Sequence, residues 1–151
     1  QWYQYTFLDE YSRFRYLEAF EEHNTYTSAV FLHHVVEKFP YAIECIQTDN
    51  GAEFTKRLLP KGNDTPTLFE NTLQELGIRH KLIRPYTPRH NGKVERSHRK
   101  DNEEFYASHR FYSFEDFKKQ LAIRERAYNN FPMRPLNWQS PKQVLSSFPN
   151  V

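Results

Sequence analysis

A segment with helical periodicity lies between two β-prone segments, and this order limits the folds open to the chain. Apolar residues recur with helical spacing over residues 25–39, and Pro40 ends that pattern. Residues 14–20 before it and residues 42–48 after it read as strands. A strand–helix–strand order predicts a crossover with a parallel pair of strands, and therefore an α/β fold.

The other segments extend this pattern. Residues 2–8 are aromatic and predict a strand that forms a hairpin with residues 14–20. A further strand is predicted over 78–83, a loop over 56–66, and helices over 67–76, 93–108, 114–130 and 141–147. The candidate caps of these helices are Asn24 or Thr25, Ser113 and Ser140 at N-termini and Gly77 at a C-terminus.

Length and composition restrict the class of protein. The 151 residues suit one domain, 1–151, and 17% aromatic residues supply core volume. A single cysteine, Cys45, excludes an internal disulfide and favours a reducing compartment, so a cytoplasmic protein is expected. No apolar run approaches the roughly 20 residues of a membrane span, so no membrane partner is expected.

The charge is distributed unevenly. The net charge is +2, yet residues 79–100 hold eight Lys or Arg and one acid, Glu95, a balance of +7 that leaves −5 for the rest. The usual meaning of a charge run is a solvated face. Clustering of this degree, with Tyr86 and three histidines in the same window, favours a polyanion such as DNA.

Two carboxylates stand in unusual settings. Asp49 follows the predicted strand 42–48, and Glu95 opens the basic helix. A strand-end Asp is more often a turn former, and a helix Glu is more often a dipole or salt-bridge partner. Forty-five residues separate the two acids, so only the fold could bring them together. Together they could hold one or two divalent cations beside a phosphate.

Four stretches in order resemble a known family. They are residues 7–13 (Phe-Leu-Asp-Glu-Tyr-Ser-Arg), 48–54 (Thr-Asp-Asn-Gly-Ala-Glu-Phe), 85–96, and 128–135 ahead of Ser140-Pro141. The chain resembles the catalytic core of DDE transposases and retroviral integrases, nearest to bacterial insertion-sequence transposases. The resemblance runs from Tyr5 to Pro141. Any one stretch would be weak support, but four in order are strong.

The resemblance implies a fold, an activity and a metal. The fold would be an α/β ribonuclease-H-like mixed sheet flanked by helices. Asp49 and Glu95 would be the second and third metal-binding carboxylates, holding Mg²⁺ or Mn²⁺. The activity would be cleavage of DNA at element ends and joining of the 3′-hydroxyls to target phosphodiesters by in-line displacement. The family usually has fewer residues between these acids, and residues 56–67 account for the excess.

The family's first metal-binding Asp lies on the first strand of its sheet, before the hairpin turn. No acid precedes Asp9 here, and Asp9 matches the family's turn acid, which is not a metal ligand. We therefore expect residues 1–151 to be an N-terminally truncated core without that Asp and without the central first strand. Two carboxylates bind Mg²⁺ more weakly than three, so this sequence alone is expected to be nearly inactive.

The resemblance also implies DNA contacts. Lys93, the first choice, and Arg99 and Lys100 would line the DNA path beside Glu95. Further DNA contacts would come from Arg89, His90 and Asn91 in the loop before this helix, and from Asn50 in the turn after Asp49. The alternative for Glu95 is a pair with Arg99 at i+4, worth a few tenths of a kcal/mol. His98 and Asn102, at i+3 and i+7, would share its helix face.

Some residues receive structural interpretations. His33, His34 and Cys45 lack zinc-ligand spacing, and a zinc site is rejected. Trp2 and Trp138 are expected to pack, since a large aromatic is more often core than a base-stacking platform. The pair Glu103-Glu104 is interpreted as a solvated helix face or a dimer contact.

Two rival functions remain open at this point. One is a nuclease of the same fold that hydrolyses DNA without joining it, which a strand-transfer assay would separate. The other is a non-catalytic DNA-binding or oligomerising fragment. The family works as multimers, so a homo-oligomer acting on DNA in the bacterial cytoplasm, at the nucleoid, is expected.

Overall fold

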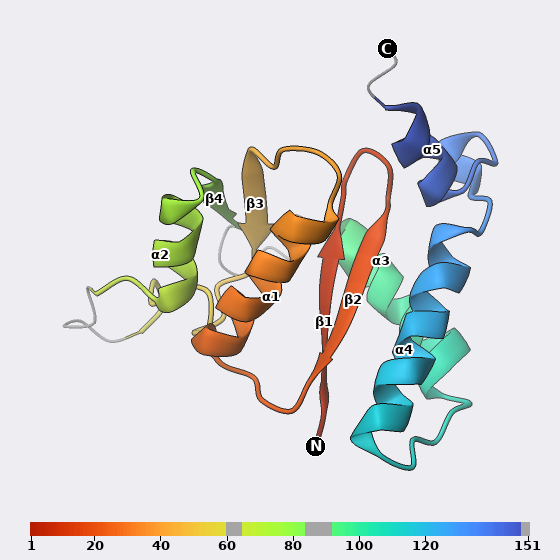
Figure 1. Ribbon diagram of the computed structural model, residues 1–151, viewed down its shortest axis with the longest axis horizontal. Helices are drawn as coiled ribbons and strands as arrows, with labels where there is room; N and C mark the ends of the chain where they lie inside the picture. Colours follow the sequence, from red (N-terminus) through yellow and green to blue (C-terminus); the bar gives the residue numbers. More distant parts are fainter. Residues whose placement is uncertain (60–64, 84–91, 149–151) are drawn as a thin grey trace. The chain divides into compact units, whose positions relative to one another are not determined.

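A computed structural model describes residues 1–59, 65–83 and 92–148 of the chain (Figure 1). The chain divides into two compact units. We call Gln1–Glu21 with Lys93–Val151 the hairpin unit, and Glu22–Gly92 the crossover unit. Both combine strands with helices, so the predicted α/β class is confirmed.

The hairpin unit begins with the predicted hairpin. Strands β1 (Tyr3–Leu8) and β2 (Arg15–Phe20) pair antiparallel, with Thr6 opposite Leu17. Alternate residues of β2 are buried, which is the period expected of a strand with one covered face. At the turn, the Asp9 carboxylate accepts from the backbone N–H and the hydroxyl of Ser12, at 3.0 and 2.6 Å. Asp9 therefore organises the turn.

Helices complete the hairpin unit. The described helices are α3 (Gly92–Asp101), α4 (Phe114–Asn129) and α5 (Pro141–Ser147), with a short 3₁₀ turn at Arg134–Leu136. Ser113 and Ser140 cap α4 and α5 by accepting from the backbone N–H groups of Asp116 and Gln143, as predicted. Figure 1 shows α4 lying beside the hairpin.

The predicted continuous helix over 93–108 is wrong beyond residue 101. The α-helix ends at Asp101, and residues Asn102–Tyr106 form a π-helix. The wider turn accompanies two contacts made by consecutive residues. Phe105 is buried in the core, while the Tyr106 hydroxyl donates to the Gln4 side-chain oxygen at 2.5 Å. Tertiary contacts with the hairpin thus override the regular helical pattern.

The core of the hairpin unit is largely aromatic. Its buried members are Leu17, Ala19, Phe105, Phe117 and Leu121. Trp2 stacks on Phe117 with ring centroids 5.9 Å apart, so its predicted packing role is confirmed. The same prediction for Trp138 is wrong, because that side chain is 67% exposed.

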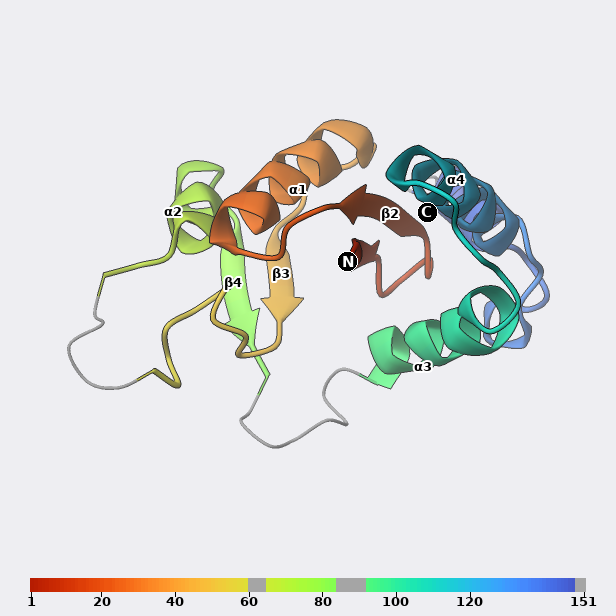
Figure 2. The same cartoon turned by 90° about the horizontal axis from the view of Figure 1, so that it is seen from below.

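The crossover unit contains two helices and two parallel strands. Helix α1 (Thr25–Lys38) begins at Asn24, whose side chain accepts from the Thr27 backbone N–H at 2.8 Å. Strand β3 (Cys45–Thr48) pairs in parallel with β4 (Arg79–Leu82), and helix α2 (Leu68–Glu75) connects them. In Figure 2 the two strands run side by side in the same direction, with α1 and α2 on one side of them.

The crossover unit closes around its own core. Leu32, Phe69, Leu73 and Ile78 are buried together. Gly77 ends α2 with φ +70, a backbone conformation that suits glycine. The Gly77 N–H donates to the Gln74 carbonyl and the Ile78 N–H to the Leu73 carbonyl. This C-cap directs Ile78 into the core just before β4 begins.

One topological prediction is wrong. The strands that flank α1, β2 and β3, do not pair with each other. In the described part of the chain, the parallel pair is β3–β4, and β2 pairs with β1. A strand–helix–strand order indicates a crossover but does not say which strands become neighbours. Here the parallel neighbours are β3 and β4, the two strands that α2 connects.

Two further expectations concern loops and membranes. Residues 55–59 form no helix or strand, in agreement with the predicted loop over 56–66, of which residues 60–64 lie outside the described ranges. No helix among the described residues combines the length and the apolar character needed to cross a bilayer.

Candidate functional site

Asp49 is exposed directly after β3, where the sequence predicted it. One carboxylate oxygen, Oδ1, accepts a hydrogen bond from the Gly51 backbone N–H at 2.8 Å. The neighbouring Thr48 hydroxyl donates to the Asp49 carbonyl oxygen at 2.9 Å. The backbone and one oxygen of Asp49 are therefore fixed, and among the residues that the structure describes no group donates to the second oxygen, which could bind a ligand.

Gly51 lies close to the Asp49 carboxylate. A Cβ atom placed at Gly51 would lie 3.0 Å from Oδ1 of Asp49, so the carboxylate would have to shift by a few tenths of an ångström to accept a side chain there. Asn50 anchors the other side of this turn, since its side-chain nitrogen donates to the Ile83 carbonyl at 3.0 Å. Its side-chain oxygen is buried and has no hydrogen-bond partner among the described residues.

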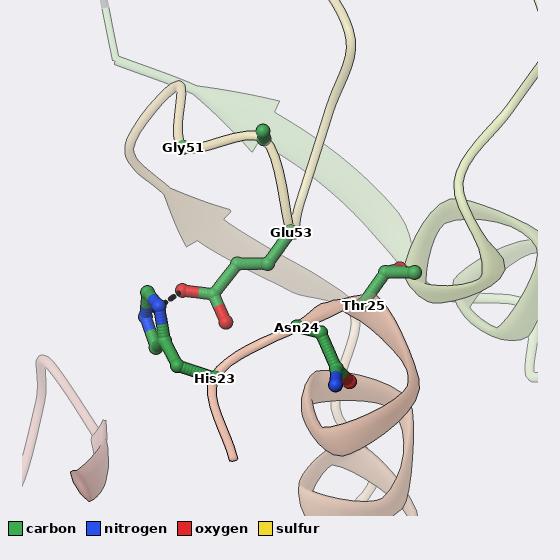
Figure 3. Close-up of a pocket in the computed structure, with 6 residues that line it drawn as sticks. His23, Asn24, Thr25, Gly51 and Glu53 are labelled. Carbon is green, nitrogen blue, oxygen red and sulfur yellow. Dashed lines mark ion pairs between the residues drawn. The ribbon is translucent and has the colours of Figure 1, made fainter. Parts of the chain in front are cut away.

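A brace centred on Glu53 holds the segment that follows. The Glu53 carboxylate accepts from the Ser28 hydroxyl at 2.6 Å and pairs with the His23 ring at 2.7 Å. Figure 3 shows His23 and Glu53 pointing toward each other beside the start of α1. A cavity of about 320 Å³ lies here, lined by residues 23–25 and 51–53. The brace ties the Asp49 turn to α1.

His80 lies behind the Asp49 strand. Its Nε2 atom is 2.7 Å from the Thr48 hydroxyl oxygen, and its ring meets the edge of Phe69. Burial lowers the pKa of His80, and the Glu70 carboxylate opposes only part of that effect. The neutral ring can donate from Nε2 to Thr48, whose own hydroxyl donates to Asp49.

Glu95 lies in the first turn of α3 and is exposed. In the described residues, no basic side chain lies within ion-pair distance of its carboxylate. The alternative Glu95–Arg99 pair is therefore absent from the structure. The buried residues of α3 are Ser97 and Asp101 on another face, so the fold leaves the Glu95 side chain accessible.

The basic residues of α3 divide into two groups. Arg99 and Lys100 are exposed, and the Lys100 ammonium lies 5.5 Å from the centre of the Phe131 ring. Lys93 is half-buried and donates to the Glu10 backbone carbonyl of the hairpin turn at 3.3 Å. Lys93 therefore has a structural contact that the sequence did not indicate.

Asp101 ends α3 in a buried network. Its carboxylate accepts hydrogen bonds from both terminal guanidinium nitrogens of Arg15, and from the side chains of Arg124 and Gln4, at 2.7–3.0 Å. Burial alone would raise the pKa of Asp101, but the Arg15 hydrogen bonds and charge hold it below its usual value. Burial also lowers the pKa of nearby His98, against the opposing Asp101 charge. The network fixes the orientation of α3 within the hairpin unit.

The predicted site residues are distributed over both units. Asp49 and Asn50 belong to the crossover unit, and Lys93, Glu95, Arg99 and Lys100 to the hairpin unit. Arg89, His90 and Asn91 lie outside the described residues. Asn102 is the first residue of the π-helix that follows α3. Glu104, expected on a solvated helix face or at a dimer contact, is 53% exposed and pairs with Arg124 at 2.9 Å.

Sequence reasoning missed the residues that support the two acids. Glu53 stood in the quoted stretch after Asp49, but its partners His23 and Ser28 come from a distant segment. The Arg15–Asp101 pair joins residues 86 positions apart. The sequence offered one indication of this pair. Arg15 lies within a strand of largely apolar residues, and a buried Arg needs a carboxylate partner.

Asp49 and Glu95 are both exposed, and Glu95 shares α3 with the exposed cations Arg99 and Lys100. Carboxylate oxygens are the ligands that Mg²⁺ and Mn²⁺ prefer. In the parts of the chain that the structure describes, no three His, Cys, Asp or Glu side chains are grouped for a metal ion. The two acids, one at a strand end and one in a basic helix, remain the candidate ligands.

Comparison with solved structures identifies the fold. The crystal structure of the catalytic core domain of BIV integrase is 18% identical, with a TM-score of 0.69 over 95% of this chain and 85% of that chain. A chain of the simian T-cell lymphotropic virus intasome, solved with PP2A regulatory subunit B56 gamma, is 16% identical, with a TM-score of 0.68. That match covers 94% of this chain and 47% of the other. The fold is ribonuclease-H-like, as predicted.

Comparison with protein families gives the same assignment from sequence. One family model described as an integrase core domain matches residues 1–88, and a second with the same description matches residues 76–141. No curated protein matches the chain. Since the first match alone spans more than half of the residues, the chain belongs to the integrase core domain family.

Proposed function

We propose that this chain is the core of a DNA transposase or integrase that cleaves DNA at element ends and joins the ends to target DNA. The integrase core domain family is a family of polynucleotidyl transferases, which supports the reaction class. The observation that carries the proposal is the combination of a fixed turn and an exposed carboxylate at Asp49. Its turn is fixed by Gly51 and Thr48, yet its carboxylate is exposed and keeps one oxygen available.

In this proposal, Asp49 and Glu95 together hold Mg²⁺ or Mn²⁺. When bound, the metal would activate a water or a 3′-hydroxyl and stabilise the leaving oxygen of the phosphodiester. Gly51 orients the Asp49 carboxylate, and the Glu53 brace keeps its turn against α1. The Asp101 network orients the helix that presents Glu95.

DNA would be bound by the cations near Glu95. We propose phosphate contacts from Arg99, Lys100 and Lys93, and further contacts from Asn50, Arg89, His90 and Asn91. Phosphate contacts position DNA without reading its sequence. A homo-oligomer acting on DNA in the bacterial cytoplasm completes the proposal. The two units would form one core domain, because a single family match, residues 1–88, crosses the boundary between them.

A strand-transfer assay with the full-length protein and Mg²⁺ tests the proposal. Asp49→Asn and Glu95→Gln should each reduce cleavage and joining by at least about 10³-fold, since each removes a charged metal ligand. Glu103→Gln changes an exposed acid just beyond α3 and should leave both steps intact. Hydrolysis without joining would favour the nuclease alternative. Equal activity in the Asp49→Asn variant would reject the proposed site.

A further inference from the structure

Trp138 occupies a tight turn in a conformation that bulky residues rarely adopt. The Gln139 N–H donates to the Leu136 carbonyl at 3.1 Å, which closes a four-residue turn. Its two central residues, Asn137 and Trp138, have φ values of 54 and 65. Turns with two central residues at positive φ strongly favour Asn first and Gly second. Trp stands where Gly would be unstrained.

Folding does not explain this choice. The Trp138 side chain is 67% exposed, so its ring contributes little buried area. The surrounding loop is nonetheless well anchored. Met133 and Ser140 are buried, and Met133 exchanges hydrogen bonds with the far side of the loop at Gln139 and Trp138, at 3.0 and 2.9 Å. A strained residue held on a rigid loop with its ring in water indicates a role in binding.

A second exposed aromatic lies on the same loop. Phe131 is 58% exposed, and the Lys100 ammonium sits 5.5 Å from its ring centre. Arg134, also exposed, falls between Phe131 and Trp138 in the sequence. The loop therefore presents flat rings together with cations, all within the hairpin unit.

The sequence of this loop and of the residues after it carries only positive charge. From Arg126 to the last residue, the sequence contains three basic residues, Arg126, Arg134 and Lys142, and no Asp or Glu. Cations beside exposed rings fit a strand of nucleic acid with unpaired bases, whose bases stack while its phosphates meet the charges. Lys, the residue type at position 100, is depleted at protein–protein interfaces.

We propose that Phe131 and Trp138, with Lys100 and Arg134, form a binding surface for single-stranded DNA. The choice of DNA over RNA rests on the proposed function, but the surface itself uses neither Asp49 nor Glu95. It would hold unpaired bases, such as those at an opened DNA end.

Fluorescence anisotropy with a labelled oligothymidine and the full-length protein tests this surface. Trp138→Gly should weaken binding about tenfold, the typical effect of losing one stacked base. The same variant should melt at an equal or higher temperature, because glycine accepts positive φ without strain. Tyr112→Ala removes an aromatic that is 90% exposed elsewhere in this unit and should leave the affinity unchanged.

Further variants keep the result decisive. Arg134→Gln should weaken binding and reduce its salt dependence, because one phosphate contact is lost. Unchanged oligothymidine affinity in Trp138→Gly and Arg134→Gln would overturn the proposal. So would a change confined to self-association, measured by sedimentation, since the loop would then join two copies of the chain. Asp49→Asn should bind oligothymidine normally, which separates failure of this surface from failure of the carboxylate site.

Discussion

Arg15 and Asp101 form a bidentate ion pair in the interior of the hairpin unit. The Arg15 Nη1–Asp101 Oδ2 and Nη2–Oδ1 distances are 2.7 and 2.8 Å, and both side chains are almost fully buried. The Arg15 guanidinium also lies 3.9 Å from the centre of the Tyr128 ring. The pair thereby connects strand β2 with the end of α3 and with α4.

Replacing one member of this pair should strongly destabilise the protein. We expect Asp101→Asn to lower the free energy of unfolding by about 3–5 kcal/mol, because the Arg15 charge stays buried without its counter-ion. Urea unfolding of the variant and the wild type measures this change.

A matched control is available in the same network. Glu104 pairs with Arg124 but is 53% exposed, so Glu104→Gln should change the free energy of unfolding by less than about 1 kcal/mol. The double variant Arg15→Met/Asp101→Leu should recover much of the lost stability, because no charge is then left buried alone. Equal losses in Asp101→Asn and Glu104→Gln would contradict the assigned role.

Stability should fall as the pH drops below about 6.5. Burial lowers the pKa values of His80 and His98 in the folded state, so between the folded and unfolded pKa values the unfolded chain binds more protons. The histidine contribution is complete above the unfolded pKa and is lost as the pH falls through the folded pKa. Urea unfolding at several pH values between 8 and about 5 measures it.

The pH dependence can be assigned to these two rings by substitution. His80→Gln together with His98→Gln should flatten the profile in this range. His33→Gln, on an exposed position of α1, should keep the wild-type slope. A double variant that retains the full slope would show that other groups cause it. Asp101, whose pKa is lowered, should add its own loss only near and below its ordinary range, about 4.

Gly51→Ala should impair catalysis more than folding. The added Cβ would sit 3.0 Å from Asp49 Oδ1, so the carboxylate would have to shift by a few tenths of an ångström. We expect a loss of roughly 10- to 100-fold in strand transfer, typical of a misplaced catalytic group. Gly92→Ala is the control, since no atom in the described part of the chain lies within 4 Å of a Cβ there. Comparable activity of the two variants would argue that Asp49 is not oriented by Gly51.

The local parts of the fold could be predicted from sequence because their causes are local. Asn24, Ser113 and Ser140 cap helices through their own side chains, and Gly77 ends α2 through its backbone freedom. The hairpin and the strand-end position of Asp49 also follow from short stretches of sequence. The family match agrees with the resemblance that these stretches carried.

Only the tertiary structure decided the contacts between distant segments. The sequence does not specify that β3 pairs with β4, that Glu53 is braced by His23 and Ser28, or that Asp101 meets Arg15. These contacts depend on which apolar faces cover one another, a property of the whole chain. Trp138 is a second example of what the sequence did not determine. A large aromatic residue is expected to be buried, but the turn at Trp138 and the buried residues that anchor its loop leave the side chain exposed.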